Sequence, residues 1–242
     1  MDLEIVWQSL PRLLDGAVLT VEITVQALIL GFCLAVPLAL LRVSRNPALW
    51  MPVYGFIFYF RGTPLLVQIF LIYYGSGQFR PLLSDIGLWP LFREAYFCAI
   101  LALTLNTAAY SAEIFRGAIQ AVPRGDIEAA RSLGMSGALL YRRIVLPQAF
   151  RLALPAYTNE VVFLLQATSL VSIITLLDLT GVARIIVARS FEPYKLYITA
   201  GLIYLAMTYV VVLGSRLLER RLSRHRREGA AAAPTETVAR LP

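Results

Sequence analysis

Five long apolar segments, separated by short polar ones, run through this chain. They cover residues 16–41, 53–74, 95–119, 154–182 and 197–218. A helix needs about 20 mainly apolar residues to cross the hydrocarbon core of a bilayer. Within lipid, only the chain itself can satisfy its backbone hydrogen bonds, which favours helices. The pattern therefore predicts an all-α membrane protein with about five transmembrane helices.

The second apolar segment is interrupted by Arg61, Gly62, Thr63 and Pro64. Glycine and proline both disfavour the interior of a helix, so a break is expected here. Two interpretations of Arg61 stay open. Either the freed backbone groups beside it line a cavity on a translocation path, or the break is a structural kink.

Composition supports a membrane location and argues against nucleic-acid binding. Hydrophobic residues make up 58% of the 242 residues and charged residues 15%, with a net charge of +7. The basic residues gather at the ends of apolar segments, as the positive-inside rule describes. Of the 22 lysines and arginines, 15 lie at 42–45, at 116–151 or from residue 216 onward. We therefore expect the N-terminus outside and the C-terminus in the cytoplasm.

Two segments complicate this simple topology. The connection from Arg184 to Lys195 carries three positive charges on the outer side, which a partly buried gate segment would explain. Residues 223–242 include a run of alanines followed by proline and are expected to form a disordered cytoplasmic tail. Residues 1–222 would then form the transmembrane domain.

The connection over residues 123–151 is too patterned for an ordinary loop. Asp126 can cap a short helix, and Glu128 suits the positive N-terminal end of that helix. Gly134 can end it in a left-handed turn. A second amphipathic stretch follows and is expected to break at Pro147.

This connection resembles the EAA signature of ATP-binding-cassette (ABC) importer permeases. The signature is Glu-Ala-Ala, three residues, Gly, nine residues, then Ile-x-Leu-Pro, and every spacing is met by Glu128, Ala129, Ala130, Gly134, Ile144, Leu146 and Pro147. The resemblance implies a type I ABC importer permease fold with a cytoplasmic coupling helix. Small alanines would let that helix approach an ATPase subunit closely, so that ATPase closure moves the permease.

The same resemblance implies that the chain lies in a bacterial inner membrane, in contact with lipid, and that it works with several protein partners. They are a second permease subunit (identical or a sister chain), two ABC ATPase subunits, and a periplasmic or extracellular solute-binding protein. ATP and magnesium would bind to the ATPase, because a P-loop needs a lysine after its glycines. The only lysine here is Lys195, in an outside segment. The chain is therefore expected to be no enzyme and to bind no cofactor or metal.

Further motifs resemble the polar amino acid family of these permeases. They are residues 60–66 (FRGTPLL), 105–117, 154–160 (LPAYTNE) and 167–169. The last two are most similar to the histidine, lysine-arginine-ornithine and octopine permeases. Many relatives carry Lys-Asp before Thr-Ser, where this chain has Gln166-Ala167. The resemblance implies import of polar, basic amino acids or opines.

Polar residues inside the apolar segments are costly and are functional candidates by default. They recur at helical spacing, on one face of the third segment and one face of the fourth. In one interpretation Glu160 and Glu113 face a cationic substrate, and in the other they pair with arginines or a partner helix. The candidates for the substrate path are Glu160, Asn159, Glu113, Asn106, Gln166 and Arg61.

Other embedded polar groups have simpler explanations. Glu22, Gln26 and Gln68 are expected to bind neighbouring helices. Asp178 either forms a gate ion pair with Arg184 or contacts substrate.

Two other classes of protein can be weighed against an importer. A secondary transporter usually has more spans and inverted repeats, and no internal repeat is visible. A membrane enzyme would need a nucleophile, base and acid set or a metal cluster, whereas the only histidine, His225, lies in the tail. ATP-dependent uptake that is lost without the ATPase would separate an importer from both.

Overall fold

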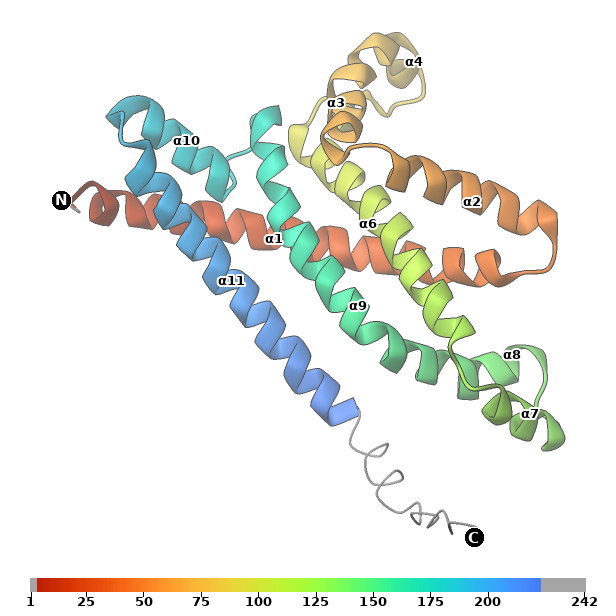
Figure 1. Ribbon diagram of the computed structural model, residues 1–242. Coiled ribbons are helices and arrows are strands. Elements are labelled where there is room, and N and C mark those ends of the chain that lie inside the picture. Colours follow the sequence, from red (N-terminus) through yellow and green to blue (C-terminus); the bar gives the residue numbers. More distant parts are fainter. Residues whose placement is uncertain (1–3, 223–242) are drawn as a thin grey trace, which may run out of the picture.

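The computed structural model describes residues 4–222, so the expected disordered tail lies outside the described residues. The described chain is helical almost throughout (Figure 1). Its α-helices are α1 (Glu4–Val43), α2 (Pro47–Gly62), α3 (Leu65–Ser76), α4 (Arg80–Asp85), α5 (Trp89–Phe92), α6 (Ala95–Gln120), α7 (Arg124–Ser132), α8 (Gly137–Leu140), α9 (Leu146–Ala167), α10 (Leu179–Ser190) and α11 (Pro193–Leu222). A π turn spans Tyr141–Val145, and 3-10 turns span Gly77–Phe79 and Thr168–Ile174.

Four helical stretches within residues 4–222 are long and apolar enough to cross a membrane. They are α1, α6, the continuous run from Gly137 to Ile174, and α11. The bent pair of helices over Pro47–Gly62 and Leu65–Asp85 makes a fifth when it is counted as one broken span. The prediction of an all-α protein with about five transmembrane helices is confirmed.

The second span is broken where the sequence predicts. Helix α2 ends at Gly62, Thr63 is extended, and α3 starts after Pro64, with 102° between the two halves. Proline suits the start of α3 because it has no N–H to leave unsatisfied in the first turn.

Small residues let the other helices pack closely around α6, which lies in the middle of the bundle. Its fully buried face is rich in alanine, including Ala99, Ala102, Ala108 and Ala112. Gly31 of α1 packs against this face so tightly that a Cβ there would collide with the methyl group of Thr107. Close approach of backbones through small residues is a common way to join helices in lipid.

The fourth span is shorter at its C-terminal end than the apolar pattern predicts, so the predicted end at residue 182 is wrong. It ends at Ile174, and Thr175 takes a left-handed conformation with φ of 76°. Asp178 then caps a separate helix, α10, by accepting from the backbone N–H groups of Thr180 (3.2 Å) and Gly181 (3.0 Å). The segment continues to look apolar because α10 packs against α1 and α11.

The same span is longer at its N-terminal end than expected, because the predicted break at Pro147 is absent. Pro147 is the second residue of α9 and lacks a backbone donor. The preceding residues widen into a π turn, in which the N–H of Leu146 reaches back to the carbonyl of Tyr141. This wider turn lets the helix continue past the proline.

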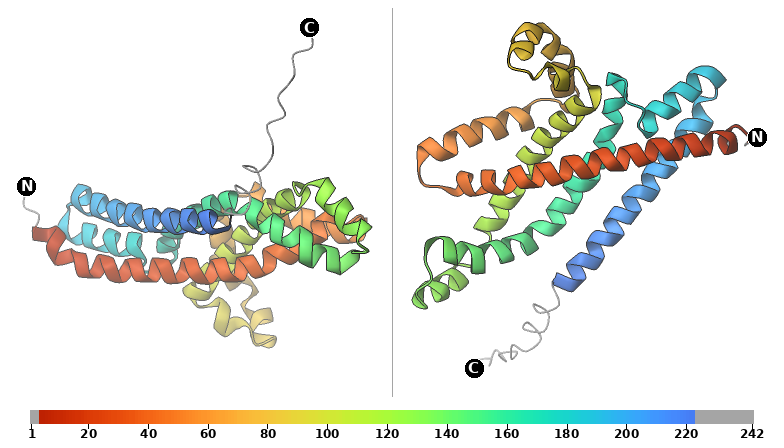
Figure 2. Two further views of the ribbon diagram at one scale, coloured as in Figure 1. Left: turned by 90° about the horizontal axis from the view of Figure 1, so that it is seen from below. Right: turned by 180° about the vertical axis from the view of Figure 1, so that it is seen from behind.

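The two ends of the bundle differ in their contents. The start of α1 lies with α10 and the start of α11 at one end, and α7, α8 and the end of α11 lie toward the other (Figures 1 and 2). The short helices α3 and α4 project to one side (Figure 1). The segment from Arg184 to Lys195 is not a free loop, because it comprises the second half of α10 and the first turn of α11.

Candidate functional site

Gln68 closes the break between α2 and α3. Its amide nitrogen donates to the carbonyl oxygens of Phe60 (2.8 Å) and Thr63 (3.0 Å) and to the hydroxyl of Thr63 (2.8 Å). Asn106 of α6 in turn donates to the Gln68 amide oxygen at 2.9 Å. Asn106 is only 3% exposed. It therefore holds the broken span against α6, although the sequence also allowed it a place on the substrate path.

Arg61 projects from the end of α2 on the exposed side of the break. Its guanidinium carbon lies 5.2 Å from the centre of the Tyr110 ring of α6, a cation–π contact. The Tyr110 ring lies 6.5 Å from that of Phe163 on α9. Asn159 and Gln166 are exposed at helical spacing on either side of Phe163. These five residues, from three helices, form what we call the polar-aromatic face.

Glu160 directly follows Asn159 on α9, so it lies beside that face. It is buried, with 7% of its surface exposed. Its Oε1 accepts a 2.8 Å hydrogen bond from the hydroxyl of Thr107 on α6. Glu160 makes no ion pair within residues 4–222. Thr107 was missed by the sequence-based search, although a hydroxyl in the buried stripe of the third span was a usable signal. Its hydrogen bond orients the Glu160 carboxylate.

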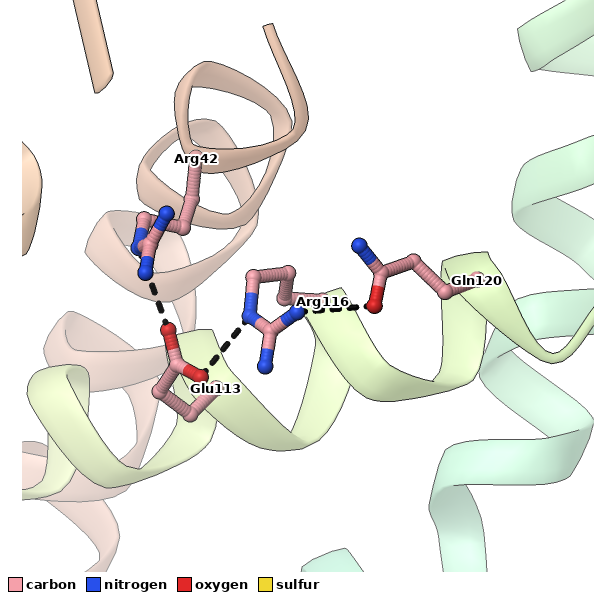
Figure 3. Close-up of polar contacts among 4 residues, drawn as sticks. All are labelled: Arg42, Glu113, Arg116 and Gln120. Carbon is pink, nitrogen blue, oxygen red and sulfur yellow. Dashed lines mark hydrogen bonds and ion pairs between the residues drawn. The ribbon is translucent and has the colours of Figure 1, made fainter.

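Glu113 is placed differently from Glu160 (Figure 3). Its Oε2 accepts from Arg116 Nε at 2.8 Å, and its Oε1 lies 3.5 Å from Arg42 Nε at the end of α1. Arg116 also donates from Nη1 to Gln120 at 2.7 Å. The structure therefore gives Glu113 two arginine partners, one on its own helix and one at the end of α1.

Asp178 and Arg184 do not form the ion pair that the sequence left open. The Asp178 side chain is fully buried and occupied by capping α10 and by the hydroxyl of Tyr204, at 3.3 Å. Arg184 donates instead to the carbonyl oxygen of Ser172 at 2.8 Å. Asp178 and Arg184 thus fasten α10 separately.

Contacts differ among the three residues that were expected to bind neighbouring helices, Glu22, Gln26 and Gln68. Glu22 accepts from the hydroxyl of Tyr96 on α6 at 2.8 Å and from Gln26 of its own helix at 3.1 Å. Gln68, as described above, is joined to Asn106 of α6. Glu22 and Gln68 therefore bind neighbouring helices.

The residues of the Glu-Ala-Ala motif lie on the short helix α7. Its alanines point to opposite sides, because Ala129 is exposed whereas Ala130 is 4% exposed and packs into the core. Ile144 and Leu146 are half-buried against that same core. They hold α7 in place, and Glu128 remains on the surface beside Ala129.

Asp126 does not cap α7, contrary to the prediction. Helix α7 starts at Arg124 after the extended Pro123, which places Asp126 in its first turn. There Asp126 accepts a 2.9 Å hydrogen bond from Gln148 of α9. This contact joins the two halves of the connection.

The end of α7 is a Schellman turn centred on Gly134. Gly134 has φ of 81°, and its N–H bonds to the carbonyl of Arg131 at 2.9 Å. The N–H of Met135 reaches the carbonyl of Ala130 at 3.0 Å. This pair of bonds satisfies carbonyls at the helix end and needs a left-handed residue, usually glycine. Leu133 is left 79% exposed beside the turn.

Comparison with known proteins gives consistent matches over almost the whole chain. Residues 27–224 match the model of the family described as "Binding-protein-dependent transport system inner membrane component". The chain is 49% identical over 240 residues to the nopaline transport system permease protein of Agrobacterium fabrum, covering 98% of this chain and 100% of that protein. It is 42% identical over 210 residues to the histidine/lysine/arginine/ornithine transport system permease protein of Salmonella typhimurium, covering 87% and 89%. The crystal structure of an amino acid ABC transporter with histidines contains a chain of TM-score 0.80 and 35% identity, covering 91% of this chain and 99% of that one.

Proposed function

Because this chain belongs to the family of binding-protein-dependent transport system inner membrane components, we propose that it carries basic amino acids or opines across the membrane as the permease subunit of an ABC importer. One observation carries this proposal: the full-length match to a nopaline permease, reinforced by the match to a basic amino acid permease. A permease subunit provides a path and no hydrolysis, so the ATPase is a separate partner.

The geometry of α7 supports a role in coupling. Glu128, Ala129 and Leu133 are exposed at one tip of the chain, while Ala130 anchors the helix to the core. A short rigid helix with a narrow alanine surface can enter a groove on an ATPase subunit and move with it. Ile144, Leu146 and Pro147 then serve as the support of this coupling helix.

The residues of the polar-aromatic face support a path for a substrate that carries both a negative carboxylate and a positive side chain. The exposed guanidinium of Arg61 can bind a carboxylate, and an aromatic ring can pack against the aliphatic part of an amino acid. Glu160 lies next to this face, is buried, and makes no ion pair within residues 4–222. A cationic side chain needs such a compensating charge in a low-dielectric path.

The proposed importer contains this chain and three further kinds of component. A second permease subunit, identical or a sister chain, completes the path on the exposed side of Arg61 and Phe163. Two ATPase subunits with ATP and magnesium dock at α7, and a solute-binding protein delivers substrate at the opposite end. The N-terminus lies outside and the C-terminus in the cytoplasm, which the distribution of basic residues supports.

Reconstituted uptake tests this function. The chain would be purified with its ATPase and sister permease, placed in liposomes with ATP inside, and supplied with binding protein and radiolabelled nopaline, octopine, arginine or histidine. We expect accumulation of at least one of these solutes that needs both ATP and the binding protein. Uptake driven equally well by a proton or sodium gradient without ATP would contradict the proposal.

A further inference from the structure

Arg42 at the end of α1 is held by three groups from two other helices. Its guanidinium carbon lies 4.7 Å from the ring centre of Tyr54 and 5.4 Å from that of Trp50, both on α2. Its Nε lies 3.5 Å from Glu113 Oε1 on α6. The two charged side chains are mostly enclosed, with 20% of Arg42 and 15% of Glu113 exposed. Arg42 therefore joins the α1–α2 corner to α6.

The contact between Arg42 and Glu113 is incompletely made. Within residues 4–222, neither Arg42 Nε nor Glu113 Oε1 has a hydrogen-bond partner, although both atoms are buried. At 3.5 Å they are too far apart for a good charge-assisted hydrogen bond, which is about 2.7–2.9 Å long. The other oxygen of Glu113 is fully engaged by Arg116 at 2.8 Å. A small movement of α6 relative to α1 would thus make or lose one strong contact.

The position of this cluster connects two parts of the machinery. Arg116 ties Glu113 to Gln120, the last residue of α6, and α7 begins four residues later (Figure 3). On the other side, α2 runs without a break from the ring of Trp50 to Arg61 at the polar-aromatic face. Helices are stiff over such lengths, so a displacement at one end appears at the other.

We propose that Glu113 is a positioning residue for transport, whose carboxylate passes movement of α7 through Arg42 to α2 and so to Arg61. This inference rests on the proposed function. The pair works as a latch: it tightens when α6 approaches the α1–α2 corner and loosens when α6 withdraws. Glu113 touches no substrate in this scheme.

The test measures how much substrate moves for each ATP hydrolysed in the reconstituted complex, with labelled arginine and binding protein. Glu113→Gln and Arg42→Gln should each lower this ratio at least about fivefold, the lower end of typical coupling effects. Combining them should lower it no further, because the contact between Arg42 and Glu113 is already lost in either single variant. Glu94→Gln, which neutralises an exposed carboxylate paired with Arg93, is the matched control and should leave the ratio unchanged.

Each other outcome overturns the inference. An unchanged ratio with reduced complex yield would show that Glu113 only stabilises the bundle. An increased KM for arginine at an unchanged ratio would place Glu113 on the substrate path instead. Additive losses in the double variant would mean that the two residues act separately. If the wild-type complex showed no ATP-dependent uptake, the proposed function and this inference would both fail.

Discussion

The hydroxyl of Thr107 on α6 donates a 2.8 Å hydrogen bond to Glu160 on α9, across 53 residues of sequence. Thr107 is 1% exposed and Glu160 7%, so the pair lies inside the bundle beside the polar-aromatic face. A carboxylate that is oriented by one hydroxyl, and that makes no ion pair within the described part of the chain, can still accept a cationic group. This arrangement motivates the first prediction.

Glu160→Gln should lower uptake of a cationic substrate, because the amide keeps the size of the side chain and removes its negative charge. We expect at least about a tenfold loss, equivalent to about 1.4 kcal/mol of lost interaction. Initial uptake rates of arginine and the yield of intact complex would be measured together. Glu94→Gln, at an exposed carboxylate between α5 and α6, is the control.

A structural role for Glu160 would give a different pattern. Uptake would then fall only in step with the yield of complex, and Thr107→Val would lower that yield as strongly as Glu160→Gln. Normal arginine uptake in Glu160→Gln would also exclude Glu160 as a substrate contact.

Gly134→Leu should uncouple ATP hydrolysis from uptake while the chain still inserts. Its φ of 81° is left-handed, where a side chain costs roughly 1–2 kcal/mol. The Schellman turn would open and the exposed end of α7 would lose its shape. Gly134→Asn is the matched control, because asparagine tolerates this conformation and should keep most of the coupling. Equal uptake per ATP in Gly134→Leu and wild type, at equal expression, would refute this.

The orientation of the chain can be determined by labelling single cysteines from outside the cell. In a chain with Cys33 and Cys98 replaced by serine, Phe191→Cys should react with a membrane-impermeant maleimide, and Leu133→Cys should react only after lysis. Both positions are well exposed, at 85% and 79%. Labelling of Leu133→Cys in intact cells would show that the orientation is opposite to the predicted one.

Gly31→Val should destabilise the bundle by about 1–3 kcal/mol, the usual cost of overpacking. The added side chain would collide with the Thr107 side chain, where α1 packs against α6. A lower midpoint of thermal unfolding of the purified complex would show this. Gly55→Val on α2, where no atom lies within 4 Å of the new Cβ, is the control. An equal midpoint in both variants would mean that α1 shifts to fit the larger side chain without any loss of stability.

Local sequence patterns were enough to predict much of this protein. The apolar segments, the break at Gly62 and Pro64, and the left-handed turn at Gly134 each depend on a few neighbouring residues. Hydrophobic length and backbone freedom are properties of short stretches, so they can be recognised without knowing the fold. The coupling motif at 128–147 was visible for the same reason, as fixed spacings along one connection.

Tertiary structure decided the partners of the buried polar groups. Asn106 meets Gln68 from 38 residues away, and Glu113 meets Arg42 on a different helix. Both Asn106 and Glu113 had been candidates for the substrate path, because helical spacing gives the face of a residue and not what lies opposite. The extent of the fourth span also depended on packing, since Asp178 caps a helix whose apolar residues α1 and α11 cover. Which atoms satisfy a buried charge is settled only when distant helices come together.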